Sequence, residues 1–197
     1  MELFSRLSAY DIILASKSPR RRELLARCGI PFRIVHRPVS ERFQDGLRPE
    51  EVVLTLCRHK ARAFDQEVSV PGTIVITADT IVADRDVILN KPDGAEHAIA
   101  MLEQLSGHAH DVLTGVCIRS HEHEIAFYEK TRVFFRPLDQ DEILYYVTNY
   151  QPFDKAGAYG IQEWIGLTGI TRIEGSYDNV VGLPVQKLFA VLKEMMA

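Results

Sequence analysis

The pattern of hydrophobic and polar positions changes its period several times along the chain. Short apolar runs rich in Val, Ile and Thr, such as 73–77, are typical of strands, and segments with a helical spacing of apolar residues, such as 49–65, separate them. This alternation predicts an α/β fold with a mixed sheet and several crossing helices. Strands are expected over 12–15, 32–36, 73–77, 112–119, 125–135 and 170–173, a hairpin over 81–89 that turns at Asp84-Arg85-Asp86, and helices over 19–28, 49–65, up to about 105, up to about 149 and over 184–196.

Several helix ends are marked by the residues that satisfy free backbone groups. Ser18 is an N-cap residue, Pro19 suits the first helical position, and Gly29 is placed to end the same helix. A capping box, in which an acidic N-cap residue is followed three positions later by Glu, predicts two further starts. These boxes are Asp93 with Glu96 and Asp139 with Glu142.

Length and composition limit the classes of protein that fit. The chain has 197 residues, 46% of them hydrophobic, so we expect one globular domain over 1–197, in one piece or folded as two lobes. No apolar run is long enough to span a membrane, and the N-terminal residues do not form a secretory signal. The net charge of −4 argues against a nucleic-acid polymer as partner. Cys28, Cys57 and Cys117 are an odd number without a CxxC pair, which indicates small buried thiols in the reducing cytoplasm.

The first chemical signal is a basic helix start after the first expected strand. Lys17, Arg20 and Arg21 lie where the helix dipole already carries positive charge, so an anion is expected to offset the repulsion. A helix N-terminus with unpaired N–H groups is a phosphate site, and basic side chains add charge-assisted bonds to it. A solvated basic helix face is the alternative interpretation.

The second signal is Asp79, which directly follows the apolar run 73–77. We expect it at the carboxyl end of that strand, the edge where α/β sheets bind ligands. A carboxylate there can hold Mg²⁺ or accept a proton from water, and Glu41 is a candidate second carboxylate. A turn aspartate and a surface glutamate are the plainer alternatives.

The third signal is the segment 151–162, where Asp154 and Lys155 precede a glycine-rich loop. Small residues allow close approach of a flat ligand, and the Gln162 amide offers a donor and an acceptor to a base edge.

Taken alone, Lys60 and Lys91 are surface lysines. The pairs His108/His110 and His121/His123 lack a third ligand for zinc, and the GxxxxGK[ST] and GxGxxG phosphate motifs are absent.

Six blocks of the sequence, taken in order, resemble the Maf family of nucleoside triphosphate pyrophosphatases. They cover the chain from about residue 12 to 190. The blocks are 14–25, 78–82, 91–92, 105–107 with 114–116, 154–162, and 175–184.

The resemblance implies a fold, a cofactor and a set of site residues. It implies a long mixed sheet flanked by helices, with two lobes around a central cleft, similar to the inosine triphosphate pyrophosphatases. It also implies a cytoplasmic homodimer that depends on a divalent cation, Mg²⁺ or Mn²⁺, with a nucleoside triphosphate as substrate. By motif, Asp79 is the catalytic base and a metal ligand with Glu41; Arg20, Thr80 and Gln162 select the base; and Ser16, Arg21, Lys60, Lys91, Asp154 and Lys155 bind the substrate.

The block 154–162 is similar to the branch of the family that acts on dTTP and UTP. Hydrolysis between the α- and β-phosphates would give a monophosphate and pyrophosphate, as house-cleaning of the nucleotide pool, with modified pyrimidine triphosphates as further substrates. The alternative is a nucleotide-binding regulator of cell division with little turnover, since the family has been linked to septum formation. Two residues depart from the family pattern: Gln151 stands where Glu is usual, and Lys17 where a small residue is common.

Overall fold

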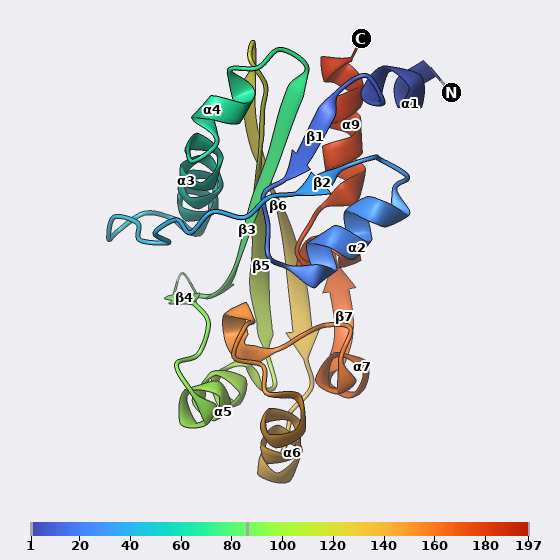
Figure 1. Ribbon diagram of the computed structural model, residues 1–197. Helices are drawn as coiled ribbons and strands as arrows, with labels where there is room; N and C mark the ends of the chain where they lie inside the picture. The colour runs from blue at the N-terminus through green and yellow to red at the C-terminus, as the bar shows by residue number, and fades with distance from the viewer. Residues whose placement is uncertain (1, 86, 197) are drawn as a thin grey trace. The chain divides into compact units, whose positions relative to one another are not determined.

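The computed structural model describes residues 2–85 and 87–196, and within them the chain forms a seven-stranded mixed sheet (Figure 1). The strand order is β2-β1-β3-β5-β6-β7, with β4 paired to β3. Strand β1 is parallel to β2 and β3, while β4 and β7 are antiparallel to β3 and β6. The strands are β1 Asp11–Leu14, β2 Arg33–Ile34, β3 Thr73–Asp84, β4 Val87–Leu89, β5 Ala109–Arg119, β6 Glu124–Phe135 and β7 Ile170–Glu174.

Helices flank this sheet, as the sequence pattern predicts. None of the helices formed by residues 2–85 and 87–196 combines the length and the apolar character needed to cross a lipid bilayer. The helices are α1 Glu2–Leu7, α2 Pro19–Arg27, α3 Pro49–Arg62, α4 Asp65–Val68, α5 Ala95–Leu105, α6 Gln140–Tyr150, the 3₁₀ helix η1 Ala156–Ala158, α7 Trp164–Gly169, α8 Tyr177–Val181 and α9 Val185–Met195.

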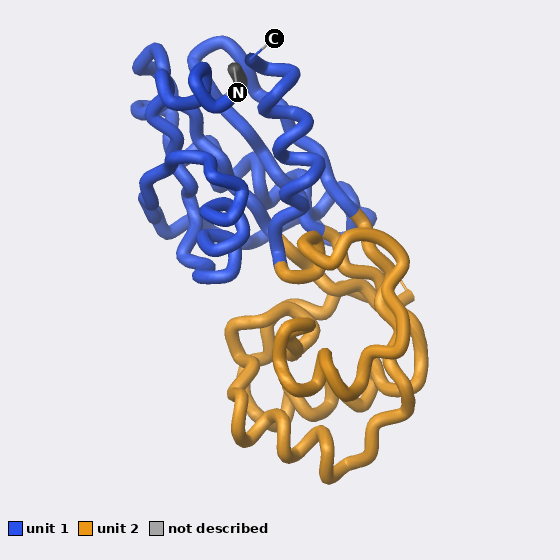
Figure 2. The backbone as a smooth tube through the Cα atoms, turned by 90° about the vertical axis from the view of Figure 1, so that its right-hand side faces the viewer, with its two compact units in different colours: residues 1–79, 114–129, 182–197 blue, residues 80–113, 130–181 orange. Residues whose placement is uncertain are grey.

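The chain divides into two compact units (Figure 2). The first unit comprises residues 1–79, 114–129 and 182–197, and the second comprises 80–113 and 130–181. In the first unit Ile13, Phe64 and Val75 belong to one apolar cluster. In the second unit Tyr146 and Leu105 are fully buried members of a larger cluster. Strands β3, β5 and β6 each contain residues of both units.

Helix ends follow the predicted caps in two cases and differ in one. The Ser18 side chain accepts a hydrogen bond from the Arg21 N–H, and the Asp139–Glu142 capping box is complete. The Asp93–Glu96 box is wrong, because Gly94 is the N-cap of α5. Helix α5 therefore begins one residue later than the capping box requires. Glu96 is its second residue and not its third, so its side chain cannot accept from the N-cap N–H.

Three segments differ from the expected elements. The runs 73–77 and 81–84 form one twelve-residue strand, because β-branched residues stand on both sides of Ala78 and Asp79 and both faces stay mostly buried. The hairpin is confirmed by pairing of Ala83 with Ile88, while Asp86 of its turn lies outside the described residues. Strand β2 is shorter than expected, and the helix expected over 49–65 ends at Arg62 and is followed by the short α4.

Candidate functional site

Asp79 lies in the middle of β3 and not at its carboxyl end, which corrects the expectation from sequence. The strand continues to Asp84 because Ile81, Val82 and Ala83 are again apolar and buried. The parallel pairing with β1, however, ends at Leu14 and Ile76, three residues before Asp79. Asp79 is thus beyond the carboxyl end of the parallel pair, although its own strand continues.

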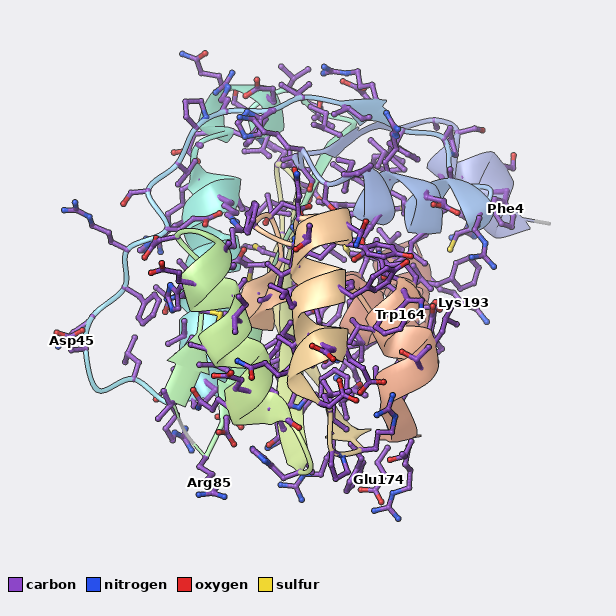
Figure 3. All side chains as sticks on the ribbon, turned by 90° about the horizontal axis from the view of Figure 1, so that it is seen from below. Phe4, Asp45, Arg85, Trp164, Glu174 and Lys193 are labelled. Atoms are coloured by element: carbon purple, nitrogen blue, oxygen red, sulfur yellow. The ribbon has the colours of Figure 1, made fainter. Side chains whose placement is uncertain are left out.

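The carboxylate of Asp79 is buried and bound to an ammonium group from a neighbouring helix. The residue is 8% exposed, and its Oδ1 accepts a hydrogen bond from Lys60 Nζ at 2.6 Å. The same Nζ lies 2.9 Å from Oε1 of Glu41, whose side chain is 47% exposed. Glu41 belongs to the segment between β2 and α3, and Asp45 of that segment is exposed at its outer bend (Figure 3). One ammonium therefore joins a buried and an exposed carboxylate.

The register between α3 and β3 explains why Lys60 meets Asp79. The Thr77 hydroxyl donates to the Cys57 carbonyl at 2.7 Å and thereby ties the strand to the helix. Asp79 is two residues after Thr77 and so lies on the same face of the strand. Lys60 is three residues after Cys57, about one helical turn. The buried hydrogen bond between Thr77 and Cys57 thus places Asp79 on β3 opposite Lys60 on α3.

A glycine lets α3 approach the sheet closely. A Cβ atom at Gly115 on β5 would lie 2.4 Å from the Val53 carbonyl oxygen, a distance that real contacts do not reach. Val53 and Lys60 are seven residues apart and lie on the same side of α3. Gly115 therefore helps to set the helix position from which Lys60 extends.

Arg21, from the first turn of α2, is fixed beside the Asp79 carboxylate. Its Nε donates to the Gly182 carbonyl at 2.7 Å, and its Nη1 donates to the Ala78 carbonyl at 2.9 Å. Burial lowers the pKa of the guanidinium, and the nearby Asp79 opposes that shift. Before α2, buried Ser16 accepts a hydrogen bond from the Ser18 N–H at 3.1 Å. The first unit thus gathers Arg21, Lys60, Asp79 and Glu41.

The chemistry of this group fits a divalent cation. Asp79 and Glu41 direct two carboxylates toward one positive charge, and Mg²⁺ is usually held by one or two carboxylates together with substrate phosphates. Among residues 2–85 and 87–196 there is no group of three or more His, Cys, Asp or Glu side chains able to hold a metal ion. Of the paired histidines, His110 is buried, and its Nε2 lies 2.8 Å from the Tyr159 hydroxyl.

The second unit contains another lysine between two carboxylates. Lys155 is 8% exposed, and its Nζ lies 2.7 Å from Asp154 Oδ1 and 3.1 Å from Glu163 Oε1. The other oxygen of Glu163 accepts a hydrogen bond from the Tyr146 hydroxyl, which in turn accepts from the Gly160 N–H at 3.0 Å. Burial raises the pKa of Tyr146, and the Glu163 carboxylate adds to the rise.

Tyr146 and Glu163 are the residues that the sequence alone did not indicate. In the sequence Tyr146 is one more apolar position of α6, and Glu163 directly follows the block that resembles the Maf family. The structure shows why position 160 is a glycine: a Cβ there would lie 2.8 Å from Glu163 Cδ, so the glycine leaves room for the carboxylate. No pattern in the sequence marks either residue.

The remaining predicted site residues divide between the two units. Arg20 is half-buried on α2, and Lys17 is exposed before that helix; both belong to the first unit. Gln151, the other departure from the family pattern, ends α6 in a left-handed conformation with φ of 45°. The second unit contains half-buried Thr80 on β3, exposed Lys91 after β4, exposed Asp154 and exposed Gln162.

Comparison with known proteins gives one family and one fold. A family model described as Maf-like protein matches residues 11–195. A relative from Bacteroides fragilis (strain YCH46), named dTTP/UTP pyrophosphatase, is 47% identical over 194 residues, which are 98% of this chain and 100% of the relative. A relative from Cytophaga hutchinsonii with the same name is 50% identical over 185 residues, which are 94% of this chain and 84% of that one.

Two solved structures share the fold at low sequence identity. The Ham1 protein of Staphylococcus aureus has a TM-score of 0.55 and 14% identity, with 94% of this chain and 99% of that chain covered. A HAM1 protein from Coxiella burnetii has a TM-score of 0.50 and 13% identity, with the same coverage of 94% and 99%. These structures confirm the expected fold similar to the inosine triphosphate pyrophosphatases, and at this identity they show the fold alone.

Proposed function

This chain belongs to the Maf family, and we propose that it hydrolyses dTTP and UTP between the α- and β-phosphates to the nucleoside monophosphate and pyrophosphate. The observation that carries the reaction is the buried Asp79 carboxylate with Lys60 and Arg21 around it. The nucleotide choice is supported by the names of the relatives, dTTP/UTP pyrophosphatase. Modified pyrimidine triphosphates are included as further substrates, in a house-cleaning role.

In this proposal the basic residues neutralise the triphosphate. Arg20 and Arg21 stand in the first turn of α2, where backbone N–H groups and the helix dipole also favour an anion. Ser16 lies just before that helix, and Lys60 reaches the same region from α3. The resemblance assigns Lys91, Asp154 and Lys155 of the second unit to substrate binding as well.

Asp79 is proposed as the base and, with Glu41, as the ligand of a divalent cation, Mg²⁺ or Mn²⁺. A bound cation would lower the pKa of a coordinated water and polarise the phosphate. Asp79 orients or deprotonates the water that attacks the α-phosphorus, and the bond to the bridging oxygen of pyrophosphate breaks. Arg21 and Lys60 stabilise the charge that develops on the phosphate oxygens.

Base selection is assigned to Arg20, Thr80 and Gln162. A site that pairs its hydrogen-bonding groups with one base rejects another base by up to about 10⁴, because buried groups are then left unpaired. We expect Gln162→Ala to lower the preference for dTTP over CTP. If the preference stays the same in that variant, Gln162 does not read the base.

The test is turnover with each common nucleoside triphosphate in the presence of Mg²⁺ or Mn²⁺. Pyrophosphate and orthophosphate are measured separately, so that cleavage at the α–β bond is distinguished from loss of the γ-phosphate. Pyrophosphate from dTTP and UTP that disappears in Asp79→Asn supports the reaction and the base together. Binding without any product would instead favour a nucleotide-binding regulator of cell division.

Two further properties belong to this proposal, a cytoplasmic location and a homodimer. The location is supported by cysteine usage, because Cys28, Cys57 and Cys117 are all free thiols, as is usual in a reducing compartment. The homodimer is supported by the family resemblance. Size-exclusion chromatography with light scattering measures the oligomeric state.

A further inference from the structure

The turn that carries Gln162 is held at both ends by one hydroxyl group. The Glu163 N–H donates to the Gly160 carbonyl at 3.0 Å and closes a four-residue turn, in which Ile161 is buried and Gln162 is exposed. The Tyr146 hydroxyl accepts from the N–H of Gly160 and donates to the carboxylate of Glu163. A single group therefore contacts the first and the last residue of the turn.

This hydroxyl is rigidly placed and stays a donor. Tyr146 is fully buried on α6, within the main apolar cluster of the second unit. Burial and the Glu163 carboxylate raise its pKa, so the phenol remains protonated in the physiological range. Its oxygen satisfies the buried Gly160 N–H, which would otherwise lack an acceptor.

The same contacts connect the turn to a buried charge. The second oxygen of Glu163 lies 3.1 Å from Lys155 Nζ. The carboxylate thus has an ammonium on one oxygen and a phenol on the other. Gly160 leaves room for it, because a Cβ there would come within 2.8 Å of Glu163 Cδ. Movement of this carboxylate would disturb both the turn with Gln162 and the placement of Lys155.

We propose that Tyr146 and Glu163 are positioning residues for nucleotide selection: Tyr146 fixes the turn that presents Gln162, and Glu163 ties this turn to Lys155. The proposal rests on the proposed function, in which Gln162 reads the base and Lys155 binds the substrate. Neither positioning residue needs to touch the nucleotide. Replacing either residue would loosen the turn that holds Gln162 without changing Gln162 itself.

The first experiment removes only the hydroxyl, with Tyr146→Phe. We expect the ratio of kcat/KM for UTP to that for CTP to fall about tenfold, the size of one hydrogen bond that involves a charged group. The matched control is Tyr159→Phe, which removes another buried hydroxyl of the same cluster, 2.8 Å from His110 Nε2. Both variants lose stability, but the control keeps the UTP/CTP ratio within about twofold of wild type.

A double variant separates positioning from general loosening. In a Gln162→Ala background, Tyr146→Phe should leave the UTP/CTP ratio unchanged, because the residue that it positions is gone. If Tyr146→Phe does not fold, Glu163→Ala replaces it, since that side chain is partly exposed and its removal frees the far end of the turn. Additive effects in the double variant, or an equal change in Tyr159→Phe, would overturn the proposal.

The outcome also distinguishes this proposal from the proposed function. If wild type forms no pyrophosphate from any triphosphate, the proposed function fails. The same variants are then compared by equilibrium binding of UTP and CTP. A preference for UTP that is lost in Tyr146→Phe and kept in Tyr159→Phe supports the positioning role without turnover. Equal binding of both nucleotides by wild type overturns it.

Discussion

Two lysines in this protein, the half-buried Lys60 and the buried Lys155, are each held between two carboxylates, one in each compact unit. In both cases one carboxylate is largely buried and the other is exposed. The side-chain exposures of the buried partners are 11% and 21%, and those of the exposed partners are 47% and 60%. The partners are Asp79 and Glu41 for Lys60, and Glu163 and Asp154 for Lys155.

The two arrangements differ in what surrounds the buried carboxylate. Asp79 lies on a strand, beside the Arg21 guanidinium, and is bound by a flexible lysine side chain. Glu163 has its second oxygen on the fixed hydroxyl of Tyr146. A flexible ammonium between two carboxylates can give way to another cation. A carboxylate fixed on both oxygens holds its neighbours in place, so the same pairing suits chemistry in one unit and positioning in the other.

The sharpest way to break this comparison is the same change in both units. Asp79→Asn should lower kcat by about 10²–10⁴, the scale of a lost general base, while Asp154→Asn should lower it less than about threefold. Each variant replaces a carboxylate next to a lysine by an amide of the same shape. Release of pyrophosphate from dTTP under saturating substrate measures both. Equal losses in the two variants would mean that Asp79 has no special role in the reaction.

The elements around Asp79 could be predicted from the sequence because their signals are local. Ser18, Pro19 and Gly29 mark the ends of α2 through cap chemistry that involves only neighbouring residues. The continuous strand through Asp79 could not be predicted, since a charged residue in an apolar run is ordinarily a strand end. The burial of Asp79 depends on Lys60, nineteen residues away, and that contact is set by tertiary packing.

In the second unit the sequence indicated the loop but not what holds it. Asp154, Lys155 and Gln162 are polar residues in a glycine-rich segment and so attract attention. Tyr146 does not, because a tyrosine at an apolar position of a helix is usually only a core residue. Its role depends on where the hydroxyl points, and that is determined by the packing of α6 against a turn fourteen residues later.

Close packing provides the next contrast, between Gly115 in the first unit and Gly160 in the second. Gly115→Ala should lower the free energy of unfolding by about 3 kcal/mol, because the new Cβ would meet the Val53 backbone carbonyl at 2.4 Å. Gly160→Ala should lower it by less, about 1–2 kcal/mol, since the Cβ would meet the Glu163 side chain and not a backbone atom, and that side chain gives way only by loosening its contacts with Tyr146 and Lys155. Urea denaturation of both variants measures the difference. A larger loss in Gly160→Ala would show that the Glu163 side chain cannot move.

Acid should affect the second unit through His110. Burial lowers the pKa of His110 to about 4 from 6.5, so the unfolded chain binds the proton more tightly. Stability is therefore present above pH 6.5 and declines as the pH falls toward 4; between pH 7 and pH 5 the loss is about 2 kcal/mol. His110→Gln should flatten this part of the profile.

Glu142 contributes at lower pH. Arg136 and the Asp139 N–H lower the pKa of Glu142 to about 2, and the stability that its carboxylate contributes is lost only below about pH 4.5.

A comparison with the first unit sharpens this test. The buried Cys57 and Cys117 thiols have pKa values raised to about 12 and do not titrate in acid. Amide protection, corrected for the slower intrinsic exchange at pH 5, should therefore fall more between pH 7 and pH 5 near His110 on β5 than near Cys57 on α3. If the stability of His110→Gln falls with acid as steeply as that of wild type, groups other than His110 cause the loss of stability.

The smallest effect concerns the hydrogen bond that sets the register of Lys60 and Asp79. Thr77→Val removes a buried hydroxyl that donates to the Cys57 carbonyl, and should lower the free energy of unfolding by about 1–2 kcal/mol. Thr168→Val is the matched control, because the Thr168 hydroxyl is exposed and donates to the Trp164 carbonyl within its own short helix; its loss should be below about 0.5 kcal/mol.

Measurements of turnover distinguish the two threonine variants. If the Thr77 bond aligns α3 with β3, Thr77→Val should also lower kcat/KM for dTTP by about three- to tenfold, since Lys60 and Asp79 shift relative to one another. Thr168→Val should leave kcat/KM unchanged. A Thr77→Val variant that is less stable but equally active would show that the Lys60–Asp79 pair keeps its own geometry. Its alignment would then come from the close contact of Val53 with Gly115 and not from the threonine.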